Sequence, residues 1–444
     1  MYVSNGAVSI GENSANSYER AAKVLPGGVS RATIERDPIP RYMDRGDGAY
    51  LFDVDGQKFL DLNNNFTTLI HGHAFPPVVR AVSEQLKSGS CFANPSRFEA
   101  RLAELLCDRV PAVSMVRFVN TGTEAVMFAI KAARAFTGRS AIAKIEGSFH
   151  GAYDWAEVSQ GGSPADWGPP ESPHSTPAYR GMPQSVLSET LVLRFNQPEE
   201  ARRLIGEHAH RLAAILIDPM PSRAGLIPPD PEFIAVLQVA CGEHGLVLIS
   251  DEVLNLRQSF NGAAARYGLE PDLVVMGKII GGGLPIGAIG GRRDVMGVFG
   301  DKHGRAILPQ SGTFSANPLS VVAGIAAMDA LDKAAFDRLE RLGERVRSGL
   351  RKAIAENKVP FCVTGTASLF RIHPRANEPH EYRDAYLTEY DIATMREMTR
   401  HLARKGVLMP PMAAASLSTP MQENECDAIV NAVDTFLRLF YNQQ

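Results

Sequence analysis

Short apolar runs recur through the middle of this chain, and stretches with helical periodicity separate them. Most of the runs are continuous rather than alternating, which is the pattern of strands in a parallel sheet that is covered on both faces. Strands that alternate with helices favour a doubly wound α/β fold, whose ligands bind beyond the carboxyl ends of the strands. The expected strands span residues 115–119, 141–145, 213–217, 246–250 and 272–276.

The two ends of the chain have a different pattern. Residues 48–62 predict a β-hairpin, because two alternating runs meet at Asp55-Gly56, a pair typical of a type I′ turn. The C-terminal part predicts a long helix and then strands over 368–372 and 406–410. We expect the two ends to form one small domain beside a large one. The predicted divisions are residues 1–70, 71–330 and 331–444.

Composition excludes several classes of protein. The 444 residues are 45% apolar and carry a net charge of -3, so the basic excess typical of nucleic-acid binders and polybasic membrane anchors is missing. No apolar run is long enough to span a bilayer. The five cysteines are scattered, which indicates neither a zinc site nor a disulfide framework and favours a reducing compartment. We expect a cytoplasmic protein without a bound metal.

Two charged residues follow expected strands at the edge where ligands bind. Lys278 comes just after 272–276 and before a cluster of glycines. Burial disfavours an ammonium, so the pKa of Lys278 should fall, and a neutral amine can attack a carbonyl carbon. Asp251 follows 246–250, where it either caps a helix or faces a cationic ligand atom. The alternative for Lys278 is a structural ion pair with Asp251.

The residues after two other strands suit a phosphate and a flat ring. Thr121, Gly122 and Thr123 begin an amphipathic helix, where free backbone N–H groups and the helix dipole favour an anion. Plain N-capping by Thr121 or Thr123 is the alternative. Phe149 lies at a strand-to-loop junction, where it either offers a flat face to a ring or fills the core.

Together these residues fit one ligand, a planar heteroaromatic aldehyde that carries a phosphate and a ring nitrogen. That ligand is pyridoxal phosphate. Lys278 would form an imine with the aldehyde, and Asp251 would hold the ring nitrogen protonated. The glycine-containing turn at the helix start would take the phosphate.

In combination, several motifs resemble a known family in their order and spacing. They are RFVNTGTEAVMFAIKAARAFTGR, EGSFHG, SDEV, PDLVVMGKIIGGGLPIGAIGG and SGTFSANP. Over nearly the whole chain they resemble the class III pyridoxal-phosphate-dependent aminotransferases of fold type I, in the branch of glutamate-1-semialdehyde aminomutase and the β-amino-acid aminotransferases. The resemblance implies a large domain with a mostly parallel seven-stranded sheet between helices.

The resemblance also implies roles for single residues. Lys278 would form the imine and then shuttle a proton, while Asp251 pairs with the ring nitrogen. A further set would contact the cofactor: Val253 and Phe149 on the two faces of its ring, and Thr121, Gly122 and Thr123 at its phosphate. Thr313 resembles the threonine that reaches the phosphate of the neighbouring subunit, which implies a homodimer with shared active sites.

On the substrate side, Arg31 resembles the arginine that takes a substrate carboxylate, although a solvated loop arginine is the alternative. Phe66 stands where the mutase has tryptophan. Met412 stands where the β-amino-acid aminotransferases have a second arginine and the mutase has a glutamate nearby. Asp218 replaces a glutamate that is common in the family, which leaves its contact near the cofactor open. We therefore expect a substrate with one carboxylate and one uncharged or aromatic group.

The reaction implied is transfer of an amino group from such a substrate to a keto acid such as 2-oxoglutarate or pyruvate. Intramolecular amino transfer, as in the aminomutase, is the first alternative; racemase or decarboxylase chemistry and a cofactor-binding sensor without catalysis are others. The loop over 160–183 is dense in glycine and proline, so it is either disordered or a lid that closes over the site.

Overall fold

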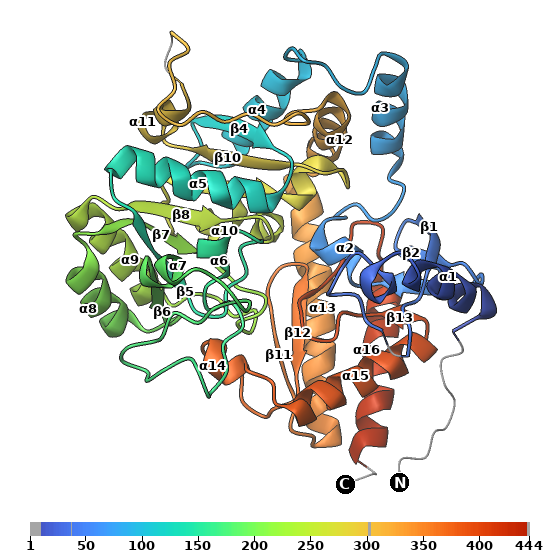
Figure 1. Ribbon diagram of the computed structural model, residues 1–444. Coiled ribbons are helices and arrows are strands. Elements are labelled where there is room, and N and C mark those ends of the chain that lie inside the picture. The colour runs from blue at the N-terminus through green and yellow to red at the C-terminus, as the bar shows by residue number, and fades with distance from the viewer. Residues whose placement is uncertain (1–9, 37, 301–302, 442–444) are drawn as a thin grey trace.

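A seven-stranded sheet between helices forms the centre of the computed structural model, which describes residues 10–36, 38–300 and 303–441 (Figure 1). Its strand order is β4-β10-β9-β8-β7-β5-β6, and only β10 runs antiparallel to its neighbours. The predicted mostly parallel sheet is confirmed. The strands are β4 (Met115–Val119), β5 (Ala141–Ile145), β6 (Thr190–Leu193), β7 (Leu212–Ile217), β8 (Val247–Asp251), β9 (Leu273–Gly277) and β10 (Gly287–Gly291).

Five of these strands lie within one residue of their expected positions, but β6 and β10 were not expected. Strand β10 has the sequence GAIGG, which lacks the β-branched and aromatic residues that usually mark a strand. Its glycines serve close packing. A Cβ atom on Gly287 would lie 2.1 Å from the carbonyl oxygen of Thr121, and one on Gly290 would lie 2.6 Å from Val113. The glycine cluster after Lys278 is therefore partly a strand.

Helices cover both faces of the sheet, because alternate strand residues point in opposite directions. On one face, Leu273 and Val275 share a core cluster with α5. On the other face, Val274 and Met276 belong to the cluster that includes α4 and α12, while Leu248 packs with α8 and α9. The helices of this region are α3 (Pro76–Lys87), α4 (Phe98–Arg109), α5 (Gly122–Thr137), α6 (Asp154–Glu157), α7 (Gln184–Ser188), α8 (Pro198–His208), α9 (Pro231–His244), α10 (Gly262–Arg266), α11 (Arg293–Met296) and α12 (Pro318–Asp329).

The N-terminal hairpin and the C-terminal segment share a second sheet, of order β1-β2-β3-β13. Strand β13 pairs in parallel with β3, with Val407 opposite Leu60, so the blue and red ends of the chain lie side by side in Figure 1. The pairing supports one small domain built from both ends. The division at residues 70 and 330 stays a prediction, and residues 1–9 and 442–444 lie outside the described residues.

The remaining elements complete this part of the molecule. The strands are β1 (Met43–Asp47), β2 (Tyr50–Asp53), β3 (Lys58–Asp61), β11 (Cys362–Thr364), β12 (Leu369–His373), β13 (Val407–Leu408) and β14 (Ala415–Ser416). The helices are α1 (Glu12–Ala22), α2 (Asn64–Thr67), α13 (Lys333–Asn357), α14 (Tyr382–Ala385), α15 (Glu389–Arg404) and α16 (Glu423–Tyr441). No helix in the described part of the chain combines the length and the apolar character needed to cross a membrane.

The hairpin between β2 and β3 is confirmed, but its predicted turn type is wrong. A type I′ turn needs a positive φ at both central residues, and of Asp55 and Gly56 only Gly56 has one, at 81°. The Asp53 carboxylate shapes the loop instead. Its Oδ1 atom accepts hydrogen bonds from the backbone N–H groups of Asp55 at 3.0 Å and Gln57 at 2.8 Å.

Candidate active site

Lys278 directly follows β9 and has a φ of 50°, in the left-handed region that non-glycine residues rarely adopt. Burial lowers the pKa of its ammonium, and the charge of Arg257 adds to that effect against the opposing influence of Asp251 and Asp218. Among the described residues, the ammonium makes no hydrogen bond and no ion pair within 4 Å. The structural ion pair with Asp251 is therefore not formed, and the Lys278 nitrogen is free to bind a ligand.

Asp251 is the last residue of β8, and its carboxylate is held by two groups. Its Oδ2 atom lies 2.7 Å from Nδ1 of the buried His150, and its Oδ1 atom accepts a hydrogen bond of 2.9 Å from the backbone N–H of Val253. Burial lowers the pKa of His150 against the opposing effect of Asp251, and the ring donates its Nδ1 proton to the carboxylate. The contact of His150 with Asp251 was not expected, because the two residues lie 101 positions apart in the sequence.

The start of α5 offers two free backbone donors. Thr121 caps the helix by accepting a hydrogen bond of 3.1 Å from the N–H of Glu124. The N–H groups of Gly122 and Thr123 donate to no acceptor within the described residues, and they stand at the positive end of a 16-residue helix. A Cβ on Gly122 would lie 2.9 Å from the Val253 side chain, so the start of α5 contacts the segment that directly follows Asp251.

Phe149 follows β5, and 48% of it is exposed, so the alternative that it fills the core is wrong. The guanidinium carbon of Arg223 lies 4.5 Å from the centroid of the Phe149 ring. Arg223 was not expected as a site residue. In the sequence, Arg223 is marked only by being an isolated cation in the glycine- and proline-containing segment after β7.

Arg31 and Phe66, which the sequence predicts as substrate contacts, lie close together. Arg31 Nη1 donates a hydrogen bond of 2.7 Å to Asn65 Oδ1, and its guanidinium carbon lies 5.9 Å from the centroid of the Phe66 ring. The turn that places Asn65 is strained, because the φ angles of Asn64, Asn65, Phe66 and Thr67 are all positive, from 48° to 70°. Arg31 is exposed to solvent, but its guanidinium is held by the Asn65 side chain, which a simply solvated loop arginine would not be.

One local and two long-range hydrogen bonds hold this left-handed turn. Asn63 Oδ1 accepts a hydrogen bond of 2.5 Å from the N–H of Phe66, while Asn64 Nδ2 donates one of 2.8 Å to the carbonyl of Ser416. Arg257 Nη1 donates one of 2.8 Å to the carbonyl of Thr67. The position of Asn65 therefore depends on the C-terminal segment and on the large sheet together.

Met412 and Thr313 lie in loops at the margins of this region. Met412 is 37% exposed, and two residues further on the N–H of Ala414 donates a hydrogen bond of 2.9 Å to Ser222 Oγ. Thr313 is exposed, and a Cβ on its neighbour Gly312 would lie 3.4 Å from the Asn120 side chain, next to the start of α5. The roles of Met412 and Thr313 stay predictions.

Asp218 lies at the end of β7 in a buried polar chain. It accepts hydrogen bonds from the Met220 N–H, at 2.9 Å, and from the Asn255 side chain. Asn255 in turn accepts one of 2.6 Å from Gln258, whose Oε1 atom accepts one of 2.8 Å from the Tyr267 hydroxyl. Burial, reinforced by the negative charge of Asp251, raises the pKa of Asp218 well above its ordinary value. This network could not be expected from sequence spacing alone.

The glycine- and proline-rich loop over 160–183 packs against α14. The Tyr382 hydroxyl donates a hydrogen bond of 2.7 Å to the carbonyl of Gly162, and Arg383 donates to the carbonyls of Trp167 and Gly168, each at 2.9 Å. Disorder, one of the two expected alternatives, is thus not what the structure shows, while the lid role stays a prediction.

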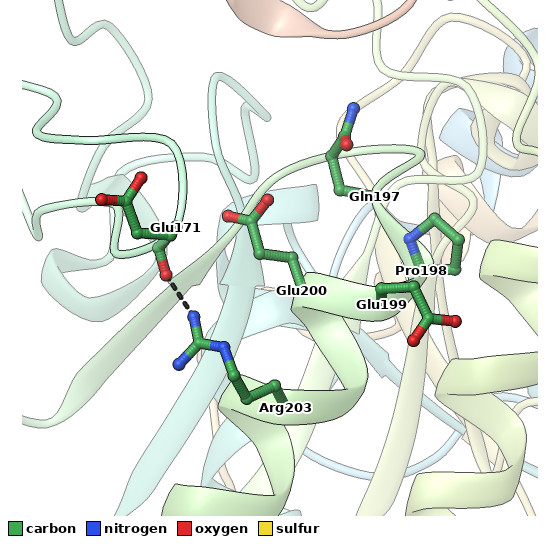
Figure 2. A pocket seen from close by; sticks show the side chains of 6 residues that line it. All are labelled: Glu171, Gln197, Pro198, Glu199, Glu200 and Arg203. Carbon is green, nitrogen blue, oxygen red and sulfur yellow. Dashed lines mark hydrogen bonds between the residues drawn. The ribbon is translucent and has the colours of Figure 1, made fainter.

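A surface hollow of about 540 Å³ lies between this loop and the start of α8 (Figure 2). Figure 2 shows Arg203 donating a hydrogen bond to the carbonyl of Glu171 across it. None of the predicted site residues lines the hollow, whose lining residues are Glu171, Gln197, Pro198, Glu199, Glu200 and Arg203.

Comparison with known proteins agrees with the fold. The family model described as aminotransferase class-III matches residues 32–433. Glutamate-1-semialdehyde 2,1-aminomutase of Methanothermobacter thermautotrophicus is 38% identical over 423 residues, which cover 95% of this chain and 97% of the relative. An ω-transaminase from Sphaerobacter thermophilus has a solved structure with a TM-score of 0.93, 45% identity and 98% of each chain covered. A β-phenylalanine aminotransferase from Variovorax paradoxus has a TM-score of 0.84 and 31% identity, with 96% of this chain and 93% of that one covered.

The fold and the residues gathered at its strand ends define a pyridoxal-phosphate-dependent enzyme of fold type I. The chain belongs to the class III aminotransferases, as its resemblance indicates. The residues present fit the cofactor, because the free nitrogen of Lys278, the buried carboxylate of Asp251 and the free N–H groups of Gly122 and Thr123 match its aldehyde, ring nitrogen and phosphate.

Proposed function

We propose that this aminotransferase takes its amino group from an amine that bears one carboxylate and an apolar or aromatic group, such as a β-amino acid. A keto acid such as 2-oxoglutarate or pyruvate would accept the amino group. The observation that carries the proposal is the free, half-buried amine of Lys278, which lies within electrostatic range of the Asp251 carboxylate that His150 holds. The similarity to an ω-transaminase and a β-phenylalanine aminotransferase supports the class of amino donor.

Each residue has a defined task in this proposal. Bound pyridoxal phosphate supplies an electron sink for the electrons left when a proton departs next to the substrate nitrogen. Lys278 Nζ holds the cofactor and, once released, accepts and returns that proton, a task favoured by its lowered pKa. Asp251 keeps the ring nitrogen protonated, and His150 fixes the direction of the carboxylate.

The remaining contacts orient the cofactor and the substrate. Thr121, Gly122 and Thr123 bind the phosphate at the start of α5. Val253 and Phe149 cover the two ring faces. On the substrate side, Arg31 binds the carboxylate in a planar, two-pronged contact, with Phe66 and Met412 beside it.

A second candidate is intramolecular amino transfer, because a glutamate-1-semialdehyde 2,1-aminomutase is 38% identical to this chain. The segment around Met412 offers methionine and alanines where a glutamate would be expected for that reaction, which favours the transaminase. The two candidates differ in a simple assay, since an intramolecular transfer needs no added keto acid.

We also propose a cytoplasmic homodimer in which Thr313 of one subunit approaches the phosphate bound by the other. The segment around Thr313 supports the dimer, because it carries Ile307 and Phe314 with 74% and 57% of their surfaces exposed. Apolar side chains this exposed favour burial against another subunit. The free thiols, including the exposed Cys91, support a reducing compartment.

The test is a Lys278→Ala variant compared with the unmodified enzyme. Because this change removes the attaching nitrogen, we expect loss of the cofactor's imine absorbance and of amino transfer, measured with a panel of amines and with pyruvate and 2-oxoglutarate as acceptors. Borohydride reduction of the unmodified enzyme should place the cofactor on Lys278. A stable adduct at another lysine, or transfer from glutamate-1-semialdehyde without any keto acid, would contradict the proposal.

A further inference from the structure

Lys144 is a fully buried lysine in the central sheet, and its neighbours in β5 are all apolar. Its ammonium donates hydrogen bonds of 2.6 Å to the carbonyl of Val158 and 3.2 Å to the carbonyl of Ser148. Glu146, the nearest acidic residue along the chain, pairs with Arg383 instead, at 2.8 Å. A buried charge that is held by neutral carbonyls is costly, and such charges are expected at functional sites.

The sheet places Lys144 on the same face as Asp251. Residues that pair across neighbouring strands point to the same side of a sheet, and so do residues two apart on one strand. Lys144 pairs with Leu216 of β7, and Leu216 pairs with Ile249 of β8, two residues before Asp251. A single strand, β7, therefore separates the strands that carry the two charged side chains.

His150 is within electrostatic reach of both charges. Its Nδ1 atom lies 2.7 Å from Asp251 Oδ2, while the carbonyl of Ser148, two residues earlier in the same loop, accepts the Lys144 hydrogen bond. Burial lowers the pKa of His150, Asp251 opposes that effect, and the positive charge of Lys144 adds to it. The Nε2 atom of the ring is buried and has no hydrogen-bond partner among the described residues. Whether the ring takes up a second proton at Nε2 thus depends on the surrounding charges.

The charge of Lys144 is present in the pH range that matters for a histidine. Burial lowers the pKa of Lys144 to about 7, with Glu146 opposing the shift and Arg223 adding to it. An ordinary histidine takes up a proton near about pH 6.5. Below about pH 7, Lys144 is therefore charged in the range where His150 would otherwise become protonated.

We propose that Lys144 is a positioning residue whose charge keeps His150 neutral, so that the ring donates one proton to Asp251 and leaves the carboxylate fully negative. This inference rests on the proposed function, in which Asp251 keeps the ring nitrogen of the cofactor protonated. A charged His150 would offset the negative charge of Asp251 and weaken its interaction with that nitrogen. The hydrogen bonds to Ser148 and Val158 hold the ammonium close to the loop of His150.

The test follows the ionisation of His150 by NMR of enzyme labelled with 15N-histidine, with and without pyridoxal phosphate. A His150→Gln variant identifies the signals of this ring among the 11 histidines. Lys144→Gln removes the charge but keeps amide donors for the two carbonyls, so we expect the midpoint of the His150 titration to rise by about one pH unit or more. Lys144→Arg keeps the charge and should leave the midpoint unchanged. In amino transfer, Lys144→Gln should lower kcat several-fold below that midpoint and change it little at higher pH.

Ser159→Ala is the matched control, because it removes hydrogen bonds from the segment next to Val158 without removing a charge. Ser159 Oγ donates a hydrogen bond of 3.0 Å to the carbonyl of His174 and accepts one of 2.9 Å from the N–H of Thr176. If Ser159→Ala shifts the His150 titration as far as Lys144→Gln does, packing rather than charge governs the ring, and the inference fails.

Two further results would overturn the inference. One is an unshifted titration in Lys144→Gln. The other needs no variant, since it is a His150 that titrates near its ordinary pH of about 6.5 in the unmodified enzyme. Both results leave the aminotransferase function standing. That function fails only if the unmodified enzyme transfers no amino group from any amine of the panel.

Discussion

Asn65 combines backbone strain with a contact to Arg31, the residue proposed to bind the substrate carboxylate. Its Oδ1 atom fixes Arg31, and its φ of 49° lies in the middle of a four-residue left-handed turn. Asparagine tolerates that conformation better than most residues, and it also provides the side-chain acceptor that glycine lacks. The residue therefore meets a conformational and a chemical demand at once.

Two substitutions at position 65 separate these demands. Both Asn65→Gly and Asn65→Ala remove the acceptor of Arg31, so we expect both to raise the KM for carboxylate substrates several-fold with little change in kcat. Asn65→Ala should also lower the free energy of unfolding by about 1 kcal/mol relative to Asn65→Gly, because alanine is strained at positive φ. Kinetics and denaturant unfolding measure the two effects. Unchanged KM values in both variants would show that Asn65 does not position Arg31.

The residues that could be predicted from sequence share a local signal. Lys278, Asp251 and Gly122 each lie at or just beyond the end of an apolar strand, and parallel strands bring their carboxyl ends to one edge. The contacts of His150 and Arg223 could not be predicted in this way, since they join segments far apart in the chain. Residue type alone does not reveal which side chain will lie beside a carboxylate or an aromatic ring.

At the scale of elements, β10 explains why a glycine-rich stretch can be a strand. Its backbone passes so close to the start of α5 that any side chain at Gly287 meets the carbonyl of Thr121. Strand propensity describes side-chain packing on a pleated surface, so it fails where close backbone approach decides the residue type. Strand β10 and the turn proposed to bind the phosphate are therefore in direct contact.

We expect Gly287→Ala to lower the free energy of unfolding by about 1–3 kcal/mol, the usual cost of overpacking, and to weaken cofactor binding by displacing the α5 start. Gly206→Ala is a matched control, because Gly206 lies within α8 and a Cβ there would meet nothing within 4 Å. That change should be neutral or stabilising. Equal stability of the two variants, measured by thermal unfolding, would contradict the role given to Gly287.

At the scale of the whole molecule, Arg257 connects three segments. Its fully buried side chain donates hydrogen bonds to the carbonyl of Thr67, the hydroxyl of Ser368 and the carbonyl of Leu417, while its backbone belongs to the segment after β8. Burial lowers the pKa of Arg257 to about 9. Its charge also helps to lower the pKa of Lys278, so the same residue stabilises the fold and tunes the site.

Removing this guanidinium should be costly. We expect Arg257→Met to lower the free energy of unfolding by about 3 kcal/mol or more, because three buried acceptors lose their donor. Arg257→Lys keeps the charge and one or two donors, so it should retain part of the stability. Where the variants fold, the pKa of the imine nitrogen on Lys278 should rise in Arg257→Met, because a nearby positive charge is lost, and not in Arg257→Lys, as a pH titration of the cofactor absorbance would show. Wild-type stability in Arg257→Met would refute this role.

The pairing of β3 with β13 sets an order of events during protein synthesis. Leu60 and Leu62 receive their partners at Gly406 and Leu408 only after most of the chain has left the ribosome. Until then β3 has an unpaired edge, which is a surface that other strands can join. The turn after β3, which holds Arg31 through Asn65, also contacts Ser416 and therefore forms late. A chain released early would expose the aggregation-prone edge of β3.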